Sequence, residues 1–157
     1  MSKKIYLIIC AVAVAVLPGC ANKSKESCGQ TCSEAVVKNL PDKLQNIVSQ
    51  KYPGAKVTDY EAKANGTEVE IRDKGIEKEL WLDRDGQWVS THWEISKRDI
   101  PAAIMDYLTT SAYADYKIDD VEVIENTQGI FYNLELKSGN NEVSVTFDKD
   151  AQVVLAK

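Results

Sequence analysis

An internal repeat constrains this chain more than any other feature of its sequence. The apolar pattern that begins at Leu40 recurs about 60 residues later at Ile100, and Leu44 corresponds in the same way to Ile104. Self-similarity at a fixed period is the signature of one supersecondary unit that is used more than once. The sequence therefore predicts two copies of a single unit, which we place at residues 39–97 and 98–157.

Each repeat is expected to open with a short helix. Proline is tolerated at the start of a helix, and Pro41 and Pro101 stand at equivalent places, each preceded at a short distance by a candidate cap, Asn39 or Asp99. Apolar residues at helical spacing then form one face in each repeat. These residues are Leu40, Leu44, Ile47 and Val48 in the first repeat and Ile100, Ile104, Tyr107 and Leu108 in the second.

Four strands are predicted to follow each helix. Apolar and polar residues alternate along these segments, as in Glu68-Val69-Glu70-Ile71, and turn sequences such as Asn65-Gly66 and Asp85-Gly86 separate them. The stretch Leu82-Asp83-Arg84-Asp85-Gly86-Gln87 matches Phe147-Asp148-Lys149-Asp150-Ala151-Gln152, which supports the repeat. The predicted strands cover residues 56–62, 67–72, 78–83 and 87–95, and then 117–125, 130–137, 142–147 and 152–155.

This order of elements predicts an α+β fold with two tandem units, each a helix on a four-stranded antiparallel sheet. A sheet with one apolar face needs a cover on that face, and the helix of the same repeat is the obvious cover. The predicted core positions are Val69, Ile71, Leu80 and Leu82 in the first unit and Leu134, Leu136, Val143, Val145 and Phe147 in the second.

Several short sequences in each repeat resemble the PepSY-like family, which is related to β-lactamase-inhibitor proteins. In the first repeat they are Leu40-Pro41, Lys51-Tyr52-Pro53-Gly54-Ala55-Lys56-Val57 and Trp81-Leu82-Asp83-Arg84-Asp85-Gly86. In the second they are Ile100-Pro101-Ala102-Ala103, Tyr116-Lys117-Ile118-Asp119-Asp120-Val121 and Phe147-Asp148-Lys149-Asp150. The resemblance implies two helix-plus-sheet units in a bacterial envelope lipoprotein, with no catalytic motif. The structural relative that lends the family its inhibitor name binds enzymes on a concave sheet surface, but a shared fold does not by itself transfer that function.

The first 19 residues have the pattern of a signal peptide. Lys3 and Lys4 precede an apolar run, 5–17, that is too short to span a bilayer comfortably. The stretch Leu17-Pro18-Gly19-Cys20 resembles the bacterial lipobox, which predicts that Cys20 carries the lipid. An ordinary secretory signal with a chance cysteine is the alternative. Residues 20–38 then read as a polar, lipidated tether, and we expect an exported envelope lipoprotein, at the outer membrane and facing the periplasm.

Two further cysteines, Cys28 and Cys32, follow the proposed lipid anchor. A disulfide is the default for thiols in an exported protein. Cβ atoms of residues four apart on a helix are separated by about 5–6 Å, more than a disulfide tolerates, so a bridge requires a non-helical segment. Free or intermolecular thiols are the alternative, and a redox or metal role is poorly supported by this spacing.

Composition and motifs disfavour several classes of function. The net charge of −5 and the pI of about 5.0 provide no basic patch for nucleic acid. His92 is the only histidine and belongs to no catalytic motif, and the Asp83-Arg84-Asp85-Gly86 stretch is better explained as a hairpin turn than as a calcium loop. We therefore expect no enzyme activity, no metal site and no cofactor.

The outward face of the predicted sheet offers the best candidate site. Because Leu80 and Leu82 should face the helix, Trp81 between them should face away. An exposed tryptophan beside acidic residues is common at interfaces, although such aromatic residues could instead cover a sheet edge or pack between the units. The candidate protein-binding face comprises Trp81, Glu68, Glu70, Trp88, His92, Phe131, Asn133 and Glu135.

Two functions remain open at this stage. The first is a non-enzymatic envelope module that binds a protein or peptide, including an inhibitor of a secreted or periplasmic enzyme. The second is a structural or stress-related envelope lipoprotein without a discrete ligand, which predicts a polar sheet face with the tryptophans buried between the repeats. In both cases the membrane is contacted only through the N-terminal lipid.

Overall fold

The computed structural model describes residues 41–157. The predictions about the signal peptide, Cys20, the tether and the Cys28–Cys32 pair concern residues outside this range, as do Asn39 and Leu40. No helix within the described range is long and apolar enough to cross a membrane. The elements are α1 (Asp42–Lys51), β1 (Lys56–Lys63), β2 (Gly66–Asp73), β3 (Ile76–Leu82), β4 (Trp88–Glu94), η1 (Lys97–Asp99), α2 (Ala102–Thr110), β5 (Lys117–Asn126), β6 (Gly129–Ser138), β7 (Asn141–Asp148) and β8 (Val153–Ala156).

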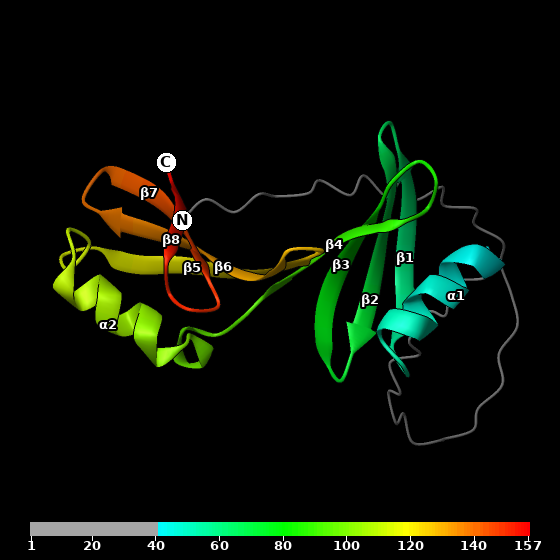
Figure 1. The fold of residues 1–157 in the computed structure, drawn as a ribbon, viewed down its shortest axis with the longest axis horizontal. Helices are drawn as coiled ribbons and strands as arrows, with labels where there is room; N and C mark the ends of the chain where they lie inside the picture. Colours follow the sequence, from blue (N-terminus) through cyan, green and yellow to red (C-terminus); the bar gives the residue numbers. More distant parts are fainter. Residues whose placement is uncertain (1–40) are drawn as a thin grey trace, which may run out of the picture. The chain divides into compact units, whose positions relative to one another are not determined.

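The eight strands form one continuous antiparallel sheet in the order β1 to β8 (Figure 1). The expectation of two separate four-stranded sheets is therefore wrong in one respect, because β4 of the first repeat pairs with β5 of the second from Ser90↔Asn126 to Glu94↔Glu122. Each repeat on its own would leave a row of unpaired backbone groups at this edge, and the pairing of the two edges satisfies both rows.

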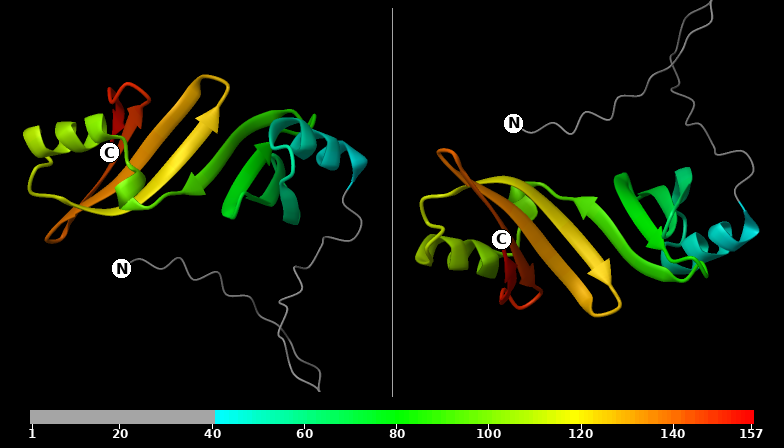
Figure 2. Two further views of the ribbon diagram at one scale, coloured as in Figure 1. Left: turned by 90° about the horizontal axis from the view of Figure 1, so that it is seen from below. Right: turned by 90° about the horizontal axis from the view of Figure 1, so that it is seen from above.

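Both helices cover the same face of this sheet. Residues directly opposite each other on paired strands share a face. Leu80, in the core under α1, is opposite Thr91, and Thr91 is opposite Glu125, so Glu125 of β5 lies on the face that α1 covers. In β5, Glu125 alternates onto the same side as Val121, which contacts the core under α2. The two views of Figure 2 show α1 and α2 on the same side of the strands.

Each helix covers its own hydrophobic core, as the repeat predicted. The first core contains Leu44, Val48, Tyr52, Val69, Ile71, Leu80 and Leu82. The second contains Ile100, Ile104, Leu108, Val121, Leu134, Leu136, Val145 and Phe147, with Val143 packed against them. Tyr107 differs from its prediction because it is 37% exposed, although its ring makes an edge contact with Phe147 at a centroid distance of 5.4 Å.

The helix starts differ from the sequence-based expectation. Pro41 and Pro101 occupy the cap positions themselves, and neither cap makes a side-chain hydrogen bond to its helix. Asp99 lies in η1 and is not the cap of α2. The carbonyl groups of both prolines accept the first helical amides, from Leu44 and Ile104, so proline serves here through its fixed φ and its carbonyl oxygen.

The matching turns after β3 and β7 have the same hydrogen bonds. The Asp83 carboxylate accepts amides of Asp85 and Gln87 at 2.9 and 2.7 Å. Asp148 accepts those of Asp150 and Gln152, both at 2.9 Å. Gly86 has a φ of 72°, and Ala151 at the equivalent place in the second turn is also left-handed, with a φ of 59°. Among the described residues these carboxylates therefore act as turn caps, in agreement with the hairpin interpretation.

Candidate functional site

The sheet face opposite the two helices carries the candidate site, and we call it the open face. Strand register assigns its residues, because side chains alternate between faces along each strand. It includes Asp59, Glu61, Glu68, Glu70, Arg72, Glu77, Glu79, Trp81, Ser90, His92, Glu94, Glu122, Ile124, Phe131, Asn133, Glu135, Ser144 and Thr146.

Every residue of the predicted protein-binding face except Trp88 lies on the open face. Glu68 is opposite Trp81, and Glu70 is opposite Glu79, which is in turn opposite His92. Phe131, Asn133 and Glu135 follow on β6 in the second repeat. Their placement agrees with the parity argument, whereas their role in binding stays a prediction.

Trp88 lies on the helix-covered face, so its predicted place beside His92 is wrong. The pairing of β3 with β4 shifts from Trp81↔Ser90 to Leu82↔Trp88, which leaves Val89 as an extra residue. Such a bulge reverses the alternation that links Trp88 to the rest of its strand. The Trp88 indole packs against the first core, and its Nε1 donates a hydrogen bond to Thr91 Oγ1 at 2.9 Å.

Trp81 is held in place on the open face by a neighbouring carboxylate. Its Nε1 donates a hydrogen bond to Glu79 Oε1 at 2.8 Å. Glu68 and Ser90 lie directly across from it on the adjacent strands. The indole is half-buried, and none of the residues of the two described cores packs against it. A large aromatic side chain is thus presented by an interior strand of the sheet and positioned by a hydrogen bond.

His92 forms an ion pair with a carboxylate from the second repeat. Its Nδ1 lies 3.2 Å from Glu122 Oε1, and Nε2 lies 3.0 Å from Ser90 Oγ. The hydrogen bond to Glu122 raises the pKa of His92 above its ordinary value of 6.5, and partial burial opposes this shift only in part. The contact joins β4 to β5, so it crosses the boundary between the repeats.

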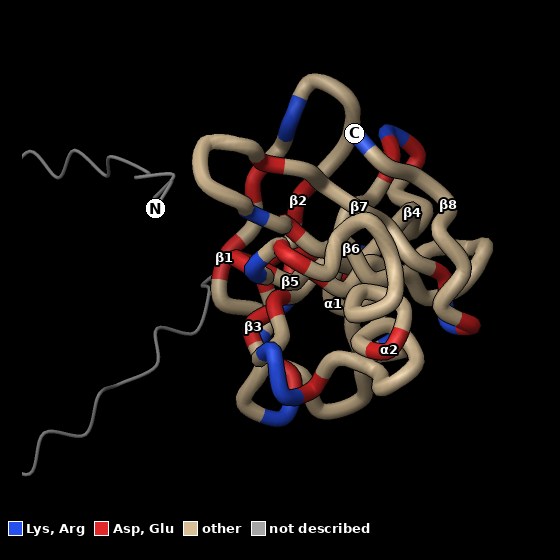
Figure 3. Tube along the Cα trace, turned by 90° about the vertical axis from the view of Figure 1, so that its left-hand side faces the viewer, with Lys and Arg blue, Asp and Glu red and all other residues tan. Residues whose placement is uncertain are grey.

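Carboxylates dominate the open face of the first repeat. Acidic positions follow one another along β1, β2 and β3 (Figure 3). Arg72 pairs with Glu77 at 2.5 Å, and Lys63 pairs with Glu61 and Glu68. Glu70 has no ion-pair partner that we find within residues 41–157. Partial burial raises its pKa, and the negative charges of Asp59, Glu68, Glu79 and Glu77 raise it further.

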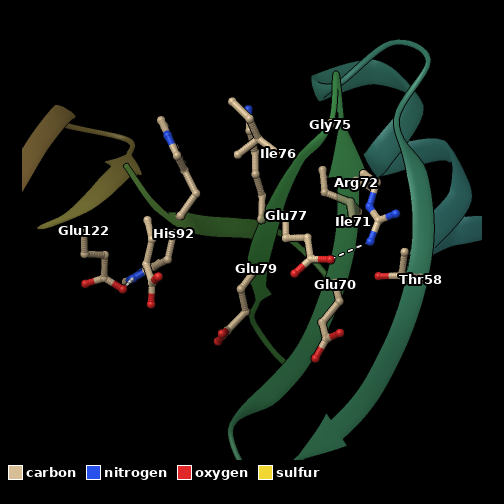
Figure 4. A pocket seen from close by; sticks show the side chains of 13 residues that line it. Thr58, Glu70, Ile71, Arg72, Gly75, Ile76, Glu77, Glu79, His92 and Glu122 are labelled. Atoms are coloured by element: carbon tan, nitrogen blue, oxygen red, sulfur yellow. Dashed lines mark hydrogen bonds and ion pairs between the residues drawn. The ribbon is translucent and has the colours of Figure 1, made fainter. Parts of the chain in front are cut away.

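A hollow of about 870 Å³ lies where β2 and β3 approach β4 and β5 (Figure 4). Carboxylates at its wall include Glu70, Glu79 and Glu122, and Ile76 contributes an exposed aliphatic side chain. Figure 4 shows the carboxylates of Glu70 and Glu79 pointing to the same side, with the His92–Glu122 pair beside them. The hollow is open to solvent, and its lining contains five glutamates together with Arg72, Lys78 and His92.

The opposite face contains a polar network that sequence reasoning missed. Glu125 of β5 accepts a hydrogen bond from Tyr52 at 2.7 Å and pairs with Lys51 at 3.0 Å. Lys51 Nζ lies 3.3 Å from the centroid of the Trp88 ring. Burial opposes ionisation of Glu125, but the bonds from Tyr52 and Lys51 outweigh it and lower its pKa. The network ties α1 to the second repeat and holds the two repeats together beside the sheet.

Glu79, Glu122 and Ile124 are among the open-face residues that sequence analysis missed. The signal for them was present, because Glu79 alternates with Leu80 and Glu122 lies between Val121 and Val123. What was missing was the pairing of β4 with β5, which places Glu122 next to His92. That pairing joins two repeats, and no local pattern specifies it.

The chemistry of the open face is suited to binding. Within residues 41–157, no three histidine, cysteine, aspartate or glutamate side chains are arranged to hold a metal ion. The face offers a fixed indole, a half-buried Phe131 and Ile124, and a field of carboxylates. Such a mixture of aromatic anchors and charges is typical of protein interfaces.

Comparison with known proteins gives matches to one family and to several solved structures. Residues 31–77 and 68–154 match the PepSY-like family, which is described as β-lactamase-inhibitor-like. No curated protein matched the chain. A BLIP-like protein from Bacteroides fragilis has a similar structure, with a TM-score of 0.67 and 24% identity, over 76% of this chain and 87% of that one. A domain-of-unknown-function protein from Bacteroides ovatus has a TM-score of 0.66 and 17% identity, over 77% of this chain and 89% of that one.

Proposed function

Since the chain belongs to the PepSY-like family of β-lactamase-inhibitor-like proteins, we propose that it is a non-enzymatic envelope module that binds a protein partner on its open face. The observation that carries the proposal is Trp81. It is presented on a central strand away from both cores, it is oriented by Glu79, and the second repeat has Thr146 in its place. The fold therefore does not require this indole, which makes it a reasonable interface anchor.

The specific form of the proposal is an inhibitor of a secreted or periplasmic enzyme. Support comes from the likeness of the fold to a BLIP-like protein. The placement of both helices on one side leaves the other side of an eight-stranded sheet available to a partner.

Capture of a partner from an envelope extract of the producing cell tests the proposal. Trp81→Ala should weaken capture by at least ~2 kcal/mol, the usual hot-spot threshold, while the melting temperature stays almost unchanged. Phe131→Ala should act in the same direction. Ile130→Ala is the matched control, because Ile130 is the next residue, is 41% exposed and lies opposite Glu125 on the other face.

Two outcomes would contradict this function. A Trp81→Ala protein that is destabilised by several kcal/mol would make the indole a packing residue. Equal loss of capture in Phe131→Ala and Ile130→Ala would show that the contact does not depend on the open face. Where the captured partner is an enzyme, its activity in the presence of the wild-type chain tests inhibition directly.

A structural envelope protein without a ligand is the second candidate. The positions of Trp88 and Trp93 favour it, because Trp88 packs on the first core and Lys78 lies 4.7 Å from the Trp93 ring on the same side. Acrylamide quenching separates the candidates. Trp81→Phe should remove the most accessible fluorescence if Trp81 presents a free binding surface, whereas a purely structural role predicts a quenching curve that this change leaves unaltered.

We also propose an envelope location with a lipid at Cys20. Support comes from the lipobox resemblance and from a similar structure from Bacteroides eggerthii, 16% identical with a TM-score of 0.63, of a candidate periplasmic protein. Cys20→Ser should release the protein from membranes on cell fractionation. A variant that stays with the membrane would contradict the anchor.

A further inference from the structure

The charge on the open face restricts what can dock there. Two cations line the hollow, but Arg72 is paired with Glu77 and Lys78 with Asp73. Each of β2, β3 and β5 also contributes a carboxylate, namely Glu70, Glu79 and Glu122. Of these, Glu122 is paired with His92, and Glu79 accepts only the Trp81 hydrogen bond among the contacts of the described residues. Glu70 lies opposite Asp59 on β1 and Glu79 on β3, so neighbouring strands place like charges on both sides of it. Burial raises the pKa of Glu70, and these carboxylates raise it further. The empty face therefore has an electrostatic cost that an approaching cation would relieve.

We propose that the partner presents a basic segment, and that a lysine or arginine side chain of that segment enters the hollow between Glu70, Glu79 and Glu122 while apolar neighbours pack on Trp81. This inference rests on the proposed docking function and names the chemistry of its partner. Complementary charge steers association and fixes register, and the aromatic contact supplies the buried area.

The arrangement of the hollow favours a side chain on a protein segment over other occupants. Trp81 is joined to Glu79 by a 2.8 Å hydrogen bond, so the apolar contact and the charged contact are adjacent on one strand. A second copy of the chain that docked through the same face would bring one carboxylate field against another. The exposed Ile76 at the rim can pack against the aliphatic stem of an entering lysine.

A pair of labelled peptides tests the charge requirement on the full chain. One is a fluorescein-labelled dodecapeptide of repeated threonine, lysine and valine, and the other has glutamine in place of each lysine. Fluorescence anisotropy should show the lysine peptide binding at least ~10-fold more tightly at low salt, with the advantage falling as ionic strength rises and screening shortens the range of the charges.

Two matched double variants locate the contact. Glu70→Gln with Glu79→Gln should weaken binding of the lysine peptide about 10-fold, and glutamine at position 79 keeps an acceptor for Trp81. Asp42→Asn with Asp106→Asn removes the same charge from exposed positions on α1 and α2, and should change binding by less than about twofold.

Each result decides the proposal. Binding that follows these differences supports it. Equal loss in both double variants would mean a general effect of net charge, and equal binding of the two peptides would mean that the hollow does not select a cation, so either overturns it. Self-association that the Glu70 and Glu79 substitutions strengthen would assign the face to a second copy instead. Trp81-dependent capture of a partner with an acidic docking surface would leave the binding function intact and overturn this inference alone.

Discussion

The ion pair between His92 and Glu122 lies on the open face and also joins the two repeats. His92 is the only histidine in the chain, and its Nδ1 lies 3.2 Å from Glu122 Oε1. The imidazole faces Glu122 from β5, Glu79 from β3 and Ser90 from its own strand. The protonated form of His92 is favoured by these carboxylates, so the ion pair stabilises the fold most fully below pH 6.5 and is lost as pH rises through the raised pKa.

We predict that one imidazole resonance titrates with a midpoint above 6.5 in the wild type. Glu122→Gln should move this midpoint downward, because it removes the charge that holds the proton. The stability difference between wild type and variant should be present below pH 6.5 and shrink above the His92 midpoint. Proton NMR of the ring measures the titration, and Glu135→Gln, on the open face of β6, serves as the control. A midpoint that Glu122→Gln leaves in place would contradict the assigned ion pair.

Trp88 lies on the opposite face from its prediction because one inserted residue, Val89, shifts the alternation of the strand. Alternation along β4 placed Trp88 with His92, but Val89 is inserted between Trp88 and Ser90 in the pairing with β3. A bulge changes the face of every residue on one side of it. Trp88 therefore completes the first core and approaches Lys51, and Trp81 is left as the tryptophan of the open face.

At the scale of elements, the two helices are equivalent covers. Leu44 and Ile104 occupy matching positions, and both are buried, at 8% and 1% exposure. The neighbouring strands present Val69 and Leu80 beneath α1 and Leu134 and Val145 beneath α2. Helices of this length are marginal in isolation, so tertiary burial of these faces is what stabilises them.

Leu44→Ala and Ile104→Ala should each lower the free energy of unfolding by roughly 2–5 kcal/mol, because each removes a buried side chain and leaves a cavity. Gln45→Ala and Met105→Ala, at the next position of each helix, are exposed and should stay within about 0.5 kcal/mol of the wild type. Denaturant melts measure all four. A nearly neutral Leu44→Ala or Ile104→Ala would contradict the assigned core faces.

At the scale of the whole molecule, the two repeats are joined by more than the chain. The pairing of β4 with β5 runs from Ser90 to Glu94, and Glu125 binds Tyr52 and Lys51 on the helix side. Strand pairing and a partly buried ionic network both lose their partners if one repeat unfolds alone. We therefore expect the repeats to unfold together, although each has its own core.

The positions of the tryptophans make this coupling measurable. Trp81, Trp88 and Trp93 are the three tryptophans of the chain, and all lie on β3 or β4, in the first repeat. Ile104→Ala destabilises the second repeat, and it should lower the midpoint of tryptophan fluorescence as much as that of far-ultraviolet circular dichroism. A fluorescence midpoint that stays at the wild-type value while the dichroism midpoint falls would show that the repeats unfold independently.

The local patterns of this sequence were sufficient to predict its helices and strands. Helical spacing around Leu44 and Ile104 and alternation around Val69 and Leu134 identified both helices, all eight strands and most of the core. The same alternation placed Trp81 on the uncovered side. These features are local to one repeat, because the period of the apolar side chains distinguishes a helix from a strand and shows which side chains share a face.

Only the tertiary structure decided how the two repeats pair and which residues therefore lie together on the open face. The β4–β5 pairing turned two expected sheets into one, the bulge at Val89 moved Trp88 to the core, and the meeting of strands brought Glu122 to His92. The backbone groups of one strand edge can pair with those of any other edge, so side chains do not specify which edges meet. A bulge inserts one residue without a change in local composition, so it has no sequence pattern of its own. The sequence alone therefore determined which residues alternate and where the helices and strands lie, while the contacts between repeats determined which of them share the open face.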